Sequence, residues 1–289
     1  LGLIKYVMSL MNGARLGIAA QSVGLSQAAY NEALAYAKDR KQFGKAIIEF
    51  PAVAEILSLM KAKLDASRTL LYETARYVDV YKALDDIAKE RKLTPEERQE
   101  QKTFSKLADS FTPLAKGIGS EFANQNAYDC IQIHGGSGFM KDYACERIYR
   151  DSRITSIYEG TTQLQVVAAI RYVTTGAYLA KIREYETAQV APEFEGLKNR
   201  LKELANKYEA IVTKITEEKD QELIDFAARR LVEMSAHLIM SHLMVQDASK
   251  NDLFTESAHV YVRFAESEID KHVTFLSKFD KDDLAYYRK

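Results

Sequence analysis

Apolar residues recur at helical spacing along almost the whole chain, and this repeat constrains the fold more than any other feature. Such a repeat lines one face of an α-helix with side chains that pack into a core. One example alternates steps of three and four: Leu197, Leu201, Leu204, Tyr208, Ile211 and Ile215. Only 4 of the 289 residues are Pro and 13 are Gly, so turns and strand ends have few candidates. With no strand pair or hairpin signal, the sequence predicts an all-α fold.

The chain is predicted to contain two helical domains. Residues 1–175 are expected to form a bundle, and residues 176–289 a smaller helical domain with three long amphipathic segments. Apolar residues make up 47% of the chain, which is enough for a buried core. The first helix is expected to end before Phe43-Gly44, and the next to begin near Pro51, because Pro suits the first helical turn.

A capping pattern lies inside the most highly charged part of the chain, residues 88–102. Thr94 precedes Pro95, and Glu97 follows three residues after Thr94, which is the pattern of a capping box. We therefore interpret the charged run as a solvated helix-loop-helix rather than a binding motif. The helix that begins there is expected to reach about His134.

Charge and composition exclude several classes of protein. A net charge of −1 argues against a general nucleic-acid binder. No apolar run approaches the roughly 20 residues of a membrane span. Cys130 and Cys145 are too few for a disulfide scaffold and suit a reducing compartment, so a cytoplasmic location is expected. The five histidines form no familiar zinc spacing, so no metal site is predicted.

Three segments differ from packing stripes. Residues 40–45 place three cations around Phe43, as either a basic helix end or a phosphate-binding fork. Residues 132–139 contain a glycine-rich run that, taken alone, indicates a helix stop and a turn. Residues 147–163 place Glu159 in a short loop before a helix expected near Thr161. That carboxylate is either a helix-start acid or a catalytic group.

Four motifs in order together carry a resemblance to a known family. They are Met11-Asn12-Gly13-Ala14-Arg15-Leu16-Gly17-Ile18-Ala19-Ala20, Arg40-Lys41-Gln42-Phe43-Gly44, Gln132-Ile133-His134-Gly135-Gly136-Ser137-Gly138-Phe139, and the stretch 146–165 with Tyr158-Glu159-Gly160-Thr161. From about Leu1 to Thr175 the chain resembles the acyl-CoA dehydrogenase family. The resemblance implies a four-helix-bundle C-terminal domain, and residues 176–289 resemble the extra helical domain of longer bacterial members.

The resemblance implies FAD-dependent α,β-dehydrogenation of an acyl-CoA thioester, with Glu159 as the catalytic base. Some family members place the base immediately before Arg15, but Ala14 occupies that position here. Arg15 matches an arginine associated with acyl-CoA binding. Six residues match FAD contacts of the family: Arg40, Phe43, Gln132, Gly136, Thr161 and Gln163. Because the family uses the residues that match Arg40 and Gln132 across a subunit interface, a homo-dimer or homo-tetramer is expected. The resemblance also implies electron-transfer flavoprotein as a partner.

The sequence also leaves alternatives open. An acyl-CoA oxidase shares the fold and the glutamate, and a non-catalytic helical oligomerisation module would keep the motifs without activity. The chain begins without Met and lacks the family's N-terminal helical and middle β domains, so it is expected to be part of a longer enzyme. Alone, it is expected neither to hold FAD tightly nor to turn over acyl-CoA.

Overall fold

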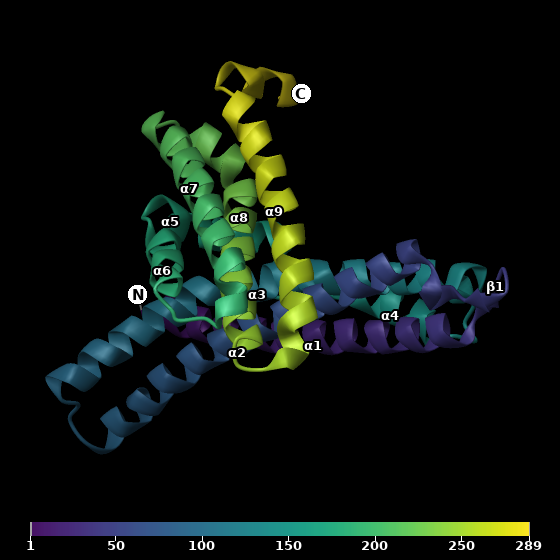
Figure 1. Ribbon diagram of the computed structural model, residues 1–289. Helices are drawn as coiled ribbons and strands as arrows, with labels where there is room; N and C mark the ends of the chain where they lie inside the picture. The colour runs from purple at the N-terminus through teal and green to yellow at the C-terminus, as the bar shows by residue number, and fades with distance from the viewer. Residues whose placement is uncertain (1, 289) are drawn as a thin grey trace. The chain divides into compact units, whose positions relative to one another are not determined.

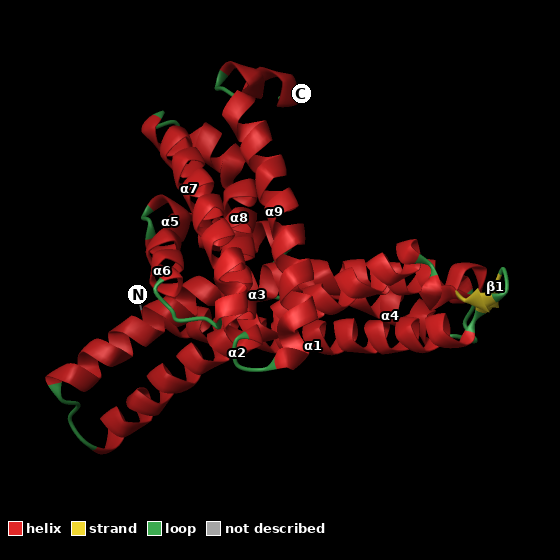
Figure 2. Cartoon of the chain, viewed as in Figure 1, coloured by secondary structure: helices red, strands yellow, loops and turns green. Residues whose placement is uncertain are grey.

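The computed structural model describes residues 2–288, and it describes the side chains of residues 10–288. Helices make up nearly all of it (Figure 2), which confirms the predicted all-α fold. Within the described residues, no helix is long and apolar enough to cross a membrane. Two compact units are present: residues 1–53 with 67–165, and residues 54–66 with 166–289. The predicted domain boundary at 175/176 stays a prediction.

The first unit is built around three long helices and two shorter segments. They are α1 (Gly2–Asp39), α2 (Pro51–Glu90) without its residues 54–66, α3 (Pro95–His134), α4 (Ala144–Ser152) and the first turn of α5 (Thr162–Thr174). In Figure 1, α1 runs alongside α3, and these two helices make the most extensive contact of the chain. Tyr77 of α2 meets Phe111 of α3 edge to face, with ring centroids 5.1 Å apart. Both rings are buried, so they help to close the bundle.

The predicted helix ends in this unit are confirmed. Pro51 occupies the first turn of α2. The Thr94 hydroxyl accepts a hydrogen bond from the Glu97 amide at 3.2 Å, and the Glu97 carboxylate accepts one from the Thr94 amide at 2.9 Å. This capping box satisfies two amides that the first turn of α3 leaves without helical partners. The helix α3 ends at His134, and Gly135 follows with φ of 60°.

The expectation that no hairpin would be present is wrong. Strands β1 (Lys41–Gln42) and β2 (Lys45–Ala46) pair in antiparallel register across a two-residue turn. Phe43 and Gly44 in the turn have φ of 50° and 84°, the left-handed conformation that tight hairpin turns use. Strands of two residues are too short to show alternation in the sequence, and Phe is not a typical turn residue there.

The second unit contains four helices that follow α5. They are α6 (Ala177–Glu186), α7 (Glu195–Glu217), α8 (Gln221–Ala248) and α9 (Thr255–Lys278). The last three lie side by side in Figure 1, as the three predicted amphipathic segments require. Their contact faces bury Tyr208 and Tyr261 completely. The Tyr208 hydroxyl bonds to Ser235 at 2.8 Å, so this polar group is satisfied inside the core.

Short 3-10 helices connect these elements and close the chain. They are η1 (Ile47–Glu49), η2 (Gly135–Phe139), η3 (Arg153–Ser156), η4 (Pro192–Phe194), η5 (Asp252–Phe254) and η6 (Asp282–Tyr287).

Candidate active site

The loop between η3 and α5 has an unusual backbone. Glu159 has φ of 55° and Gly160 has φ of 93°. A non-glycine residue at positive φ costs roughly 1–3 kcal/mol, so the surrounding structure must hold it there. The positive φ of Gly160 strains any L side chain, and a Cβ there would lie 2.9 Å from Nε2 of Gln165 and displace it, so glycine is favoured at this position. Glu159 is thus presented by a strained turn, as predicted for a loop residue rather than a helical one.

Three side chains from three helices hold this turn through its carbonyl groups. Arg15 of α1 donates its Nε–H to the Glu159 carbonyl oxygen at 3.2 Å. Lys116 of α3 donates from Nζ to the Gly160 carbonyl oxygen at 2.6 Å. Gln165 of α5 donates from Nε2 to both carbonyl oxygens, at 3.3 Å for Glu159 and 3.0 Å for Gly160. These bonds fix the direction in which the Glu159 side chain leaves the backbone.

The cations behind the turn are buried. Lys116 is 0% exposed and Arg15 is 8% exposed. Burial lowers the pKa of Lys116 to about 8, and the nearby charge of Arg15 lowers it further, while Glu121 and Glu159 act in the opposite direction. Burial also lowers the pKa of Arg15, and the charge of Glu159 partly offsets that effect. The Glu159 carboxylate therefore acts electrostatically on two cations that its own loop covers.

Two polar groups of Glu159, its side-chain carboxylate and its backbone N–H, are left available for hydrogen bonding. Among the side chains that the structure describes, none donates a hydrogen bond to the Glu159 carboxylate, and its backbone N–H finds no acceptor among the described groups. The residue is only partly buried. A single residue here offers an acceptor for a proton and, through its N–H, a donor to negative charge developing nearby.

Tyr158 anchors the loop on its other side. Its hydroxyl donates to Oε1 of Gln21 on α1. Burial raises the pKa of Tyr158, and the negative charge of Glu159 raises it further. Tyr158 therefore stays neutral beside the carboxylate and serves as an anchor.

The predicted cofactor residues fall into two separate groups. Thr161 and Gln163 lie next to Glu159 and are exposed, and Thr161 Oγ1 accepts a hydrogen bond from the Leu164 amide at 3.3 Å. The other group lies where α1 and α3 end. Along α3, the sixteen residues from Lys116 to Gln132 correspond to roughly 24 Å at 1.5 Å per residue. The structure therefore does not bring the two groups together within one chain.

The distant group consists of exposed residues. Arg40, Gln132 and Gly136 are exposed, and the Phe43 ring is 87% exposed at the tip of the hairpin. The Tyr36 hydroxyl donates to Ser137 Oγ at 3.4 Å and ties this end of α1 to η2. A guanidinium and an amide can bind phosphate and hydroxyl groups, and a Cβ on Gly136 would meet nothing within 4 Å. This donor set and this open surface are compatible with a ligand that carries phosphate and hydroxyl groups, and the FAD contacts of all six residues stay predictions.

Lys116 and Gln165 are site residues that the sequence analysis missed. Lys116 stands in the apolar run Pro113-Leu114-Ala115-Lys116-Gly117-Ile118. A lysine inside such a run is rarely buried without a partner, and this was the available signal. Gln165 gave no comparable signal, because a glutamine in the first turns of a helix is ordinary.

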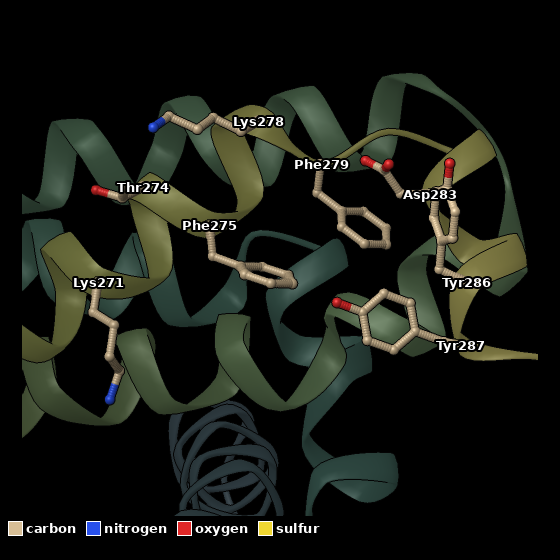
Figure 3. A pocket seen from close by; sticks show the side chains of 8 residues that line it. All are labelled: Lys271, Thr274, Phe275, Lys278, Phe279, Asp283, Tyr286 and Tyr287. Atoms are coloured by element: carbon tan, nitrogen blue, oxygen red, sulfur yellow. The ribbon is translucent and has the colours of Figure 1, made fainter.

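The second unit carries a hollow of its own, of about 580 Å³, at the C-terminal end of α9. Figure 3 shows the rings of Phe275, Phe279 and Tyr287 turned toward one another there, with Lys278 at the edge. The Phe279 ring also stacks on Phe226 of α8, with centroids 4.6 Å apart. No predicted site residue lies in this hollow, and its rings serve to pack η6 against α8 and α9.

Comparisons with known proteins identify the class. The model of the "Acyl-CoA dehydrogenase, C-terminal domain" family matches residues 4–173, and the model "Acyl-CoA dehydrogenase C terminal" matches residues 174–284. The first match alone covers more than half of the chain. The chain belongs to the acyl-CoA dehydrogenase family.

Individual relatives cover the chain in part. The caffeyl-CoA reductase-Etf complex subunit CarC of Acetobacterium woodii is 39% identical over 158 residues, which are 55% of this chain and 35% of that protein. The short-chain specific acyl-CoA dehydrogenase of Megasphaera elsdenii is 34% identical over 175 residues, 61% of this chain and 38% of that protein. The chain thus spans little more than a third of the length of these relatives.

One solved structure shares the fold along nearly the whole chain. It is an acyl-CoA dehydrogenase complexed with FAD from Bacillus anthracis, with a TM-score of 0.75 and 22% identity. The match covers 96% of this chain and 51% of that one. It therefore includes both helical units, which confirms the predicted resemblance of fold.

Proposed function

We propose that this chain is the helical C-terminal part of an FAD-dependent acyl-CoA dehydrogenase, in which Glu159 removes the α-proton of the acyl thioester. The observation that carries the proposal is the held turn: Arg15, Lys116 and Gln165 fix the carbonyl groups of residues 159 and 160 and leave the Glu159 carboxylate without a partner among the described side chains. A merely capping acid would not need three donors behind it.

The proposed reaction breaks two carbon–hydrogen bonds. The Glu159 carboxylate takes the α-hydrogen as a proton, and the electron pair left behind forms the α,β double bond. FAD, when bound, supplies the acceptor for the hydride that leaves the β carbon. The thioester oxygen carries negative charge during this step, and the backbone N–H of Glu159 is placed on the same residue to donate to it.

Arg15 is proposed to act as a positioning residue. Sequence resemblance associates it with acyl-CoA binding, yet its Nε–H is used by the Glu159 carbonyl. Its guanidinium therefore helps to set the direction of the base, and its Nη1 donates to Oδ1 of Asn12 at 3.4 Å. This arrangement supports a role in positioning, while the proposed role in substrate binding rests on the resemblance alone.

The division of the cofactor residues supports a homo-oligomer. If Thr161 and Gln163 contact the FAD beside Glu159, then Arg40, Phe43, Gln132 and Gly136 are too far along the bundle to share that cofactor, so they serve the FAD of a neighbouring subunit. Electron-transfer flavoprotein is the proposed electron acceptor, in line with the name of the Acetobacterium woodii relative. A cytoplasmic location stays a prediction.

The same groups serve the reaction in both directions. A glutamate that takes the α-proton in one direction returns it in the other, by microscopic reversibility. Two relatives are named as reductases, a caffeyl-CoA reductase subunit and a 3-(aryl)acrylate reductase of Clostridium sporogenes. Reduction of an α,β-unsaturated acyl-CoA is therefore the second candidate function at this same site.

The proposal is tested by measuring turnover of a protein in which this chain is joined to an N-terminal and a middle domain of the family. Glu159→Gln keeps the shape of the side chain and removes the base, so acyl-CoA-dependent reduction of an artificial dye is expected to fall by at least about 100-fold, the contribution of general base catalysis. FAD content is expected to stay unchanged. Glu193→Gln, at an exposed position of the second unit, is the matched control. Full turnover by Glu159→Gln would refute the proposal.

The electron acceptor that reoxidises the reduced enzyme distinguishes a dehydrogenase from an oxidase. Reoxidation of the reduced enzyme is measured by stopped flow with air and with electron-transfer flavoprotein. A dehydrogenase reacts faster with the flavoprotein, whereas fast reaction with air would identify an oxidase. The third alternative, a non-catalytic oligomerisation module, predicts no turnover even in the unsubstituted enzyme.

A further inference from the structure

Cys130, His134 and Cys145 form a buried cluster in the first unit, where α3, η2 and α4 meet. Their ligand atoms all lie within 4.8 Å of one another, and Cys130 Sγ lies 3.9 Å from His134 Nδ1. Both cysteines are 0% exposed and His134 is 4% exposed. The chain has no other cysteine, so both of its thiols meet at this one place.

The local fold brings the three residues together. Cys130 and His134 are one turn apart on α3, so they share a face of the helix. The turn η2 then folds back so closely that a Cβ on Gly138 would lie 2.8 Å from the carbonyl oxygen of Ile131. This reversal delivers Cys145, the second residue of α4, to the same face.

His134 is held with its ring fixed. Nδ1 lies 2.8 Å from the Cys130 carbonyl oxygen, and because a carbonyl only accepts, Nδ1 carries the hydrogen. Nε2 therefore has the lone pair. The ring stacks on Tyr36 of α1, with centroids 4.2 Å apart. Nδ1 is also the ring nitrogen that lies 3.9 Å from Cys130 Sγ, so metal binding through Nδ1 requires it to give up its proton and its bond to the carbonyl oxygen.

The alternative is that two buried thiols simply fill the core, as free cysteines often do. Burial raises the pKa of Cys130 well above its ordinary range, and the charges of Cys145 and then Glu32 add to this effect. Such thiols are poor nucleophiles, which disfavours a reactive or redox role. A bound cation would favour the thiolate form instead, because thiols that ligate a metal are deprotonated. Packing also does not explain why the one histidine of α3 joins both thiols.

We propose that Cys130, His134 and Cys145 together bind one zinc-class cation, which fastens η2 to α3 and α4. Zinc takes sulfur at about 2.3 Å and nitrogen at about 2.0–2.1 Å, which separates ligand atoms in a tetrahedral site by roughly 3.5–3.8 Å. The ligand atoms here lie within 4.8 Å of one another, so the longest separation must shorten by roughly 1.0–1.3 Å. The fourth position is left for water, because the cluster holds three ligand residues.

The cation would have a structural effect on a segment of proposed functional importance. Gly136, a proposed FAD contact, lies in η2 between His134 and Cys145. Binding of the cation is nevertheless a property of this chain alone and does not depend on the proposed activity. It is therefore tested on the 289-residue chain without substrate or FAD.

Cobalt(II) is the first probe, because thiolate ligation gives it intense near-ultraviolet charge-transfer bands. The chain is reduced, freed of metal with a chelator, and titrated with cobalt and then with zinc. We expect one cobalt per chain, with charge-transfer bands and a tetrahedral visible spectrum, and displacement by zinc. Cys130→Ala and Cys145→Ala are each expected to abolish the bands and to weaken zinc binding at least tenfold, the lower range for loss of supporting groups around a metal. His259→Gln, at an exposed histidine, is the matched control.

Three experimental results would each refute the proposal. Zinc bound equally well by both alanine variants would show surface binding only, and no uptake by the unsubstituted chain would refute the site. A Cys130–Cys145 disulfide that forms in air while the reduced chain takes up no metal would also overturn it. Far-ultraviolet circular dichroism of each variant checks folding. If an alanine variant unfolds, His134→Phe, which keeps a ring against Tyr36, is expected to lose zinc affinity while remaining helical.

Discussion

Replacing Lys116 by methionine is expected to change how the stability of the chain depends on pH. Lys116 is fully buried and donates to the Gly160 carbonyl oxygen. Burial, followed by the charge of Arg15, lowers the pKa of Lys116 from 10.5 to about 8. Since one pKa unit corresponds to about 1.4 kcal/mol, keeping this charge buried costs roughly 3 kcal/mol. The two acids that face Lys116, Glu121 and Glu159, raise its pKa, and the value of about 8 already includes their effect.

The sign of the effect follows from proton binding. Below a pH of about 8 the lysine is protonated in both the folded and unfolded chain, and the cost is present in full. Between about 8 and 10.5 the unfolded chain binds more protons than the folded one, so stability rises with pH. Lys116→Met loses a charged hydrogen bond worth roughly 1.5–3 kcal/mol and also the burial cost, so the two chains are expected to have similar stability at neutral pH.

Urea unfolding followed by far-ultraviolet circular dichroism measures the difference. The free energy of unfolding of the unsubstituted chain, relative to Lys116→Met, is expected to increase by up to about 3 kcal/mol as the pH rises through that interval. Lys106→Met, at an exposed position of the same helix, is the matched control. A difference between the unsubstituted chain and Lys116→Met that does not change with pH would refute the assignment of Lys116 as a buried cation.

Two further substitutions test the local structure. Gly160→Ala places a Cβ on a left-handed backbone, 2.9 Å from the Gln165 amide nitrogen. Thermal unfolding should therefore show that the folded state loses about 1–3 kcal/mol of stability. An unchanged melting temperature would show that the turn relaxes without cost. Thr94→Ala removes the side-chain cap of α3 and should cost about 1 kcal/mol of helix stability. Hydrogen exchange of the first amides of α3 should then become roughly fivefold faster, with Thr103→Ala as the control. Equal exchange rates in both variants would contradict the role of the cap.

Much of the fold could be predicted because its signals are local. Thr94, Pro95 and Glu97 lie within one turn, and the two capping hydrogen bonds join Thr94 to Glu97 without help from a distant residue. Pro51 marks a helix start for the same kind of reason, since its missing amide has no partner to lose there. The apolar stripes of α7, α8 and α9 identify the buried faces, because burial follows from spacing alone.

What the sequence did not predict depends on contacts between distant residues. The hairpin at 41–46 is held by a turn in which Phe43 takes a positive φ, and no propensity favours this. Lys116 becomes a site residue only because the loop at Gly160, forty-four residues later, covers it. Cys130 and Cys145 are brought together by the reversal at Gly138, so a search for zinc spacing in the sequence finds nothing.

The candidate site was predicted unevenly. Resemblance pointed to Glu159, and the structure places Arg15 behind it, so two residues far apart in sequence prove to be neighbours. Resemblance could not indicate that Arg15 uses its Nε–H on the Glu159 carbonyl, because a motif carries no hydrogen-bond geometry. The roles of Arg40, Phe43, Gln132, Gly136, Thr161 and Gln163 stay predictions, since they concern a cofactor and a second subunit.

Exchange of the substrate α-proton with solvent tests the central claim most directly, because it reports the base without requiring hydride transfer to be complete. The chain joined to its N-terminal and middle domains is incubated with an acyl-CoA in D₂O, and deuterium at the α carbon is followed by mass spectrometry. We predict exchange in the unsubstituted enzyme and at least about 100-fold slower exchange in Glu159→Gln, with FAD still bound. Equal exchange in both enzymes would show that another group is the base.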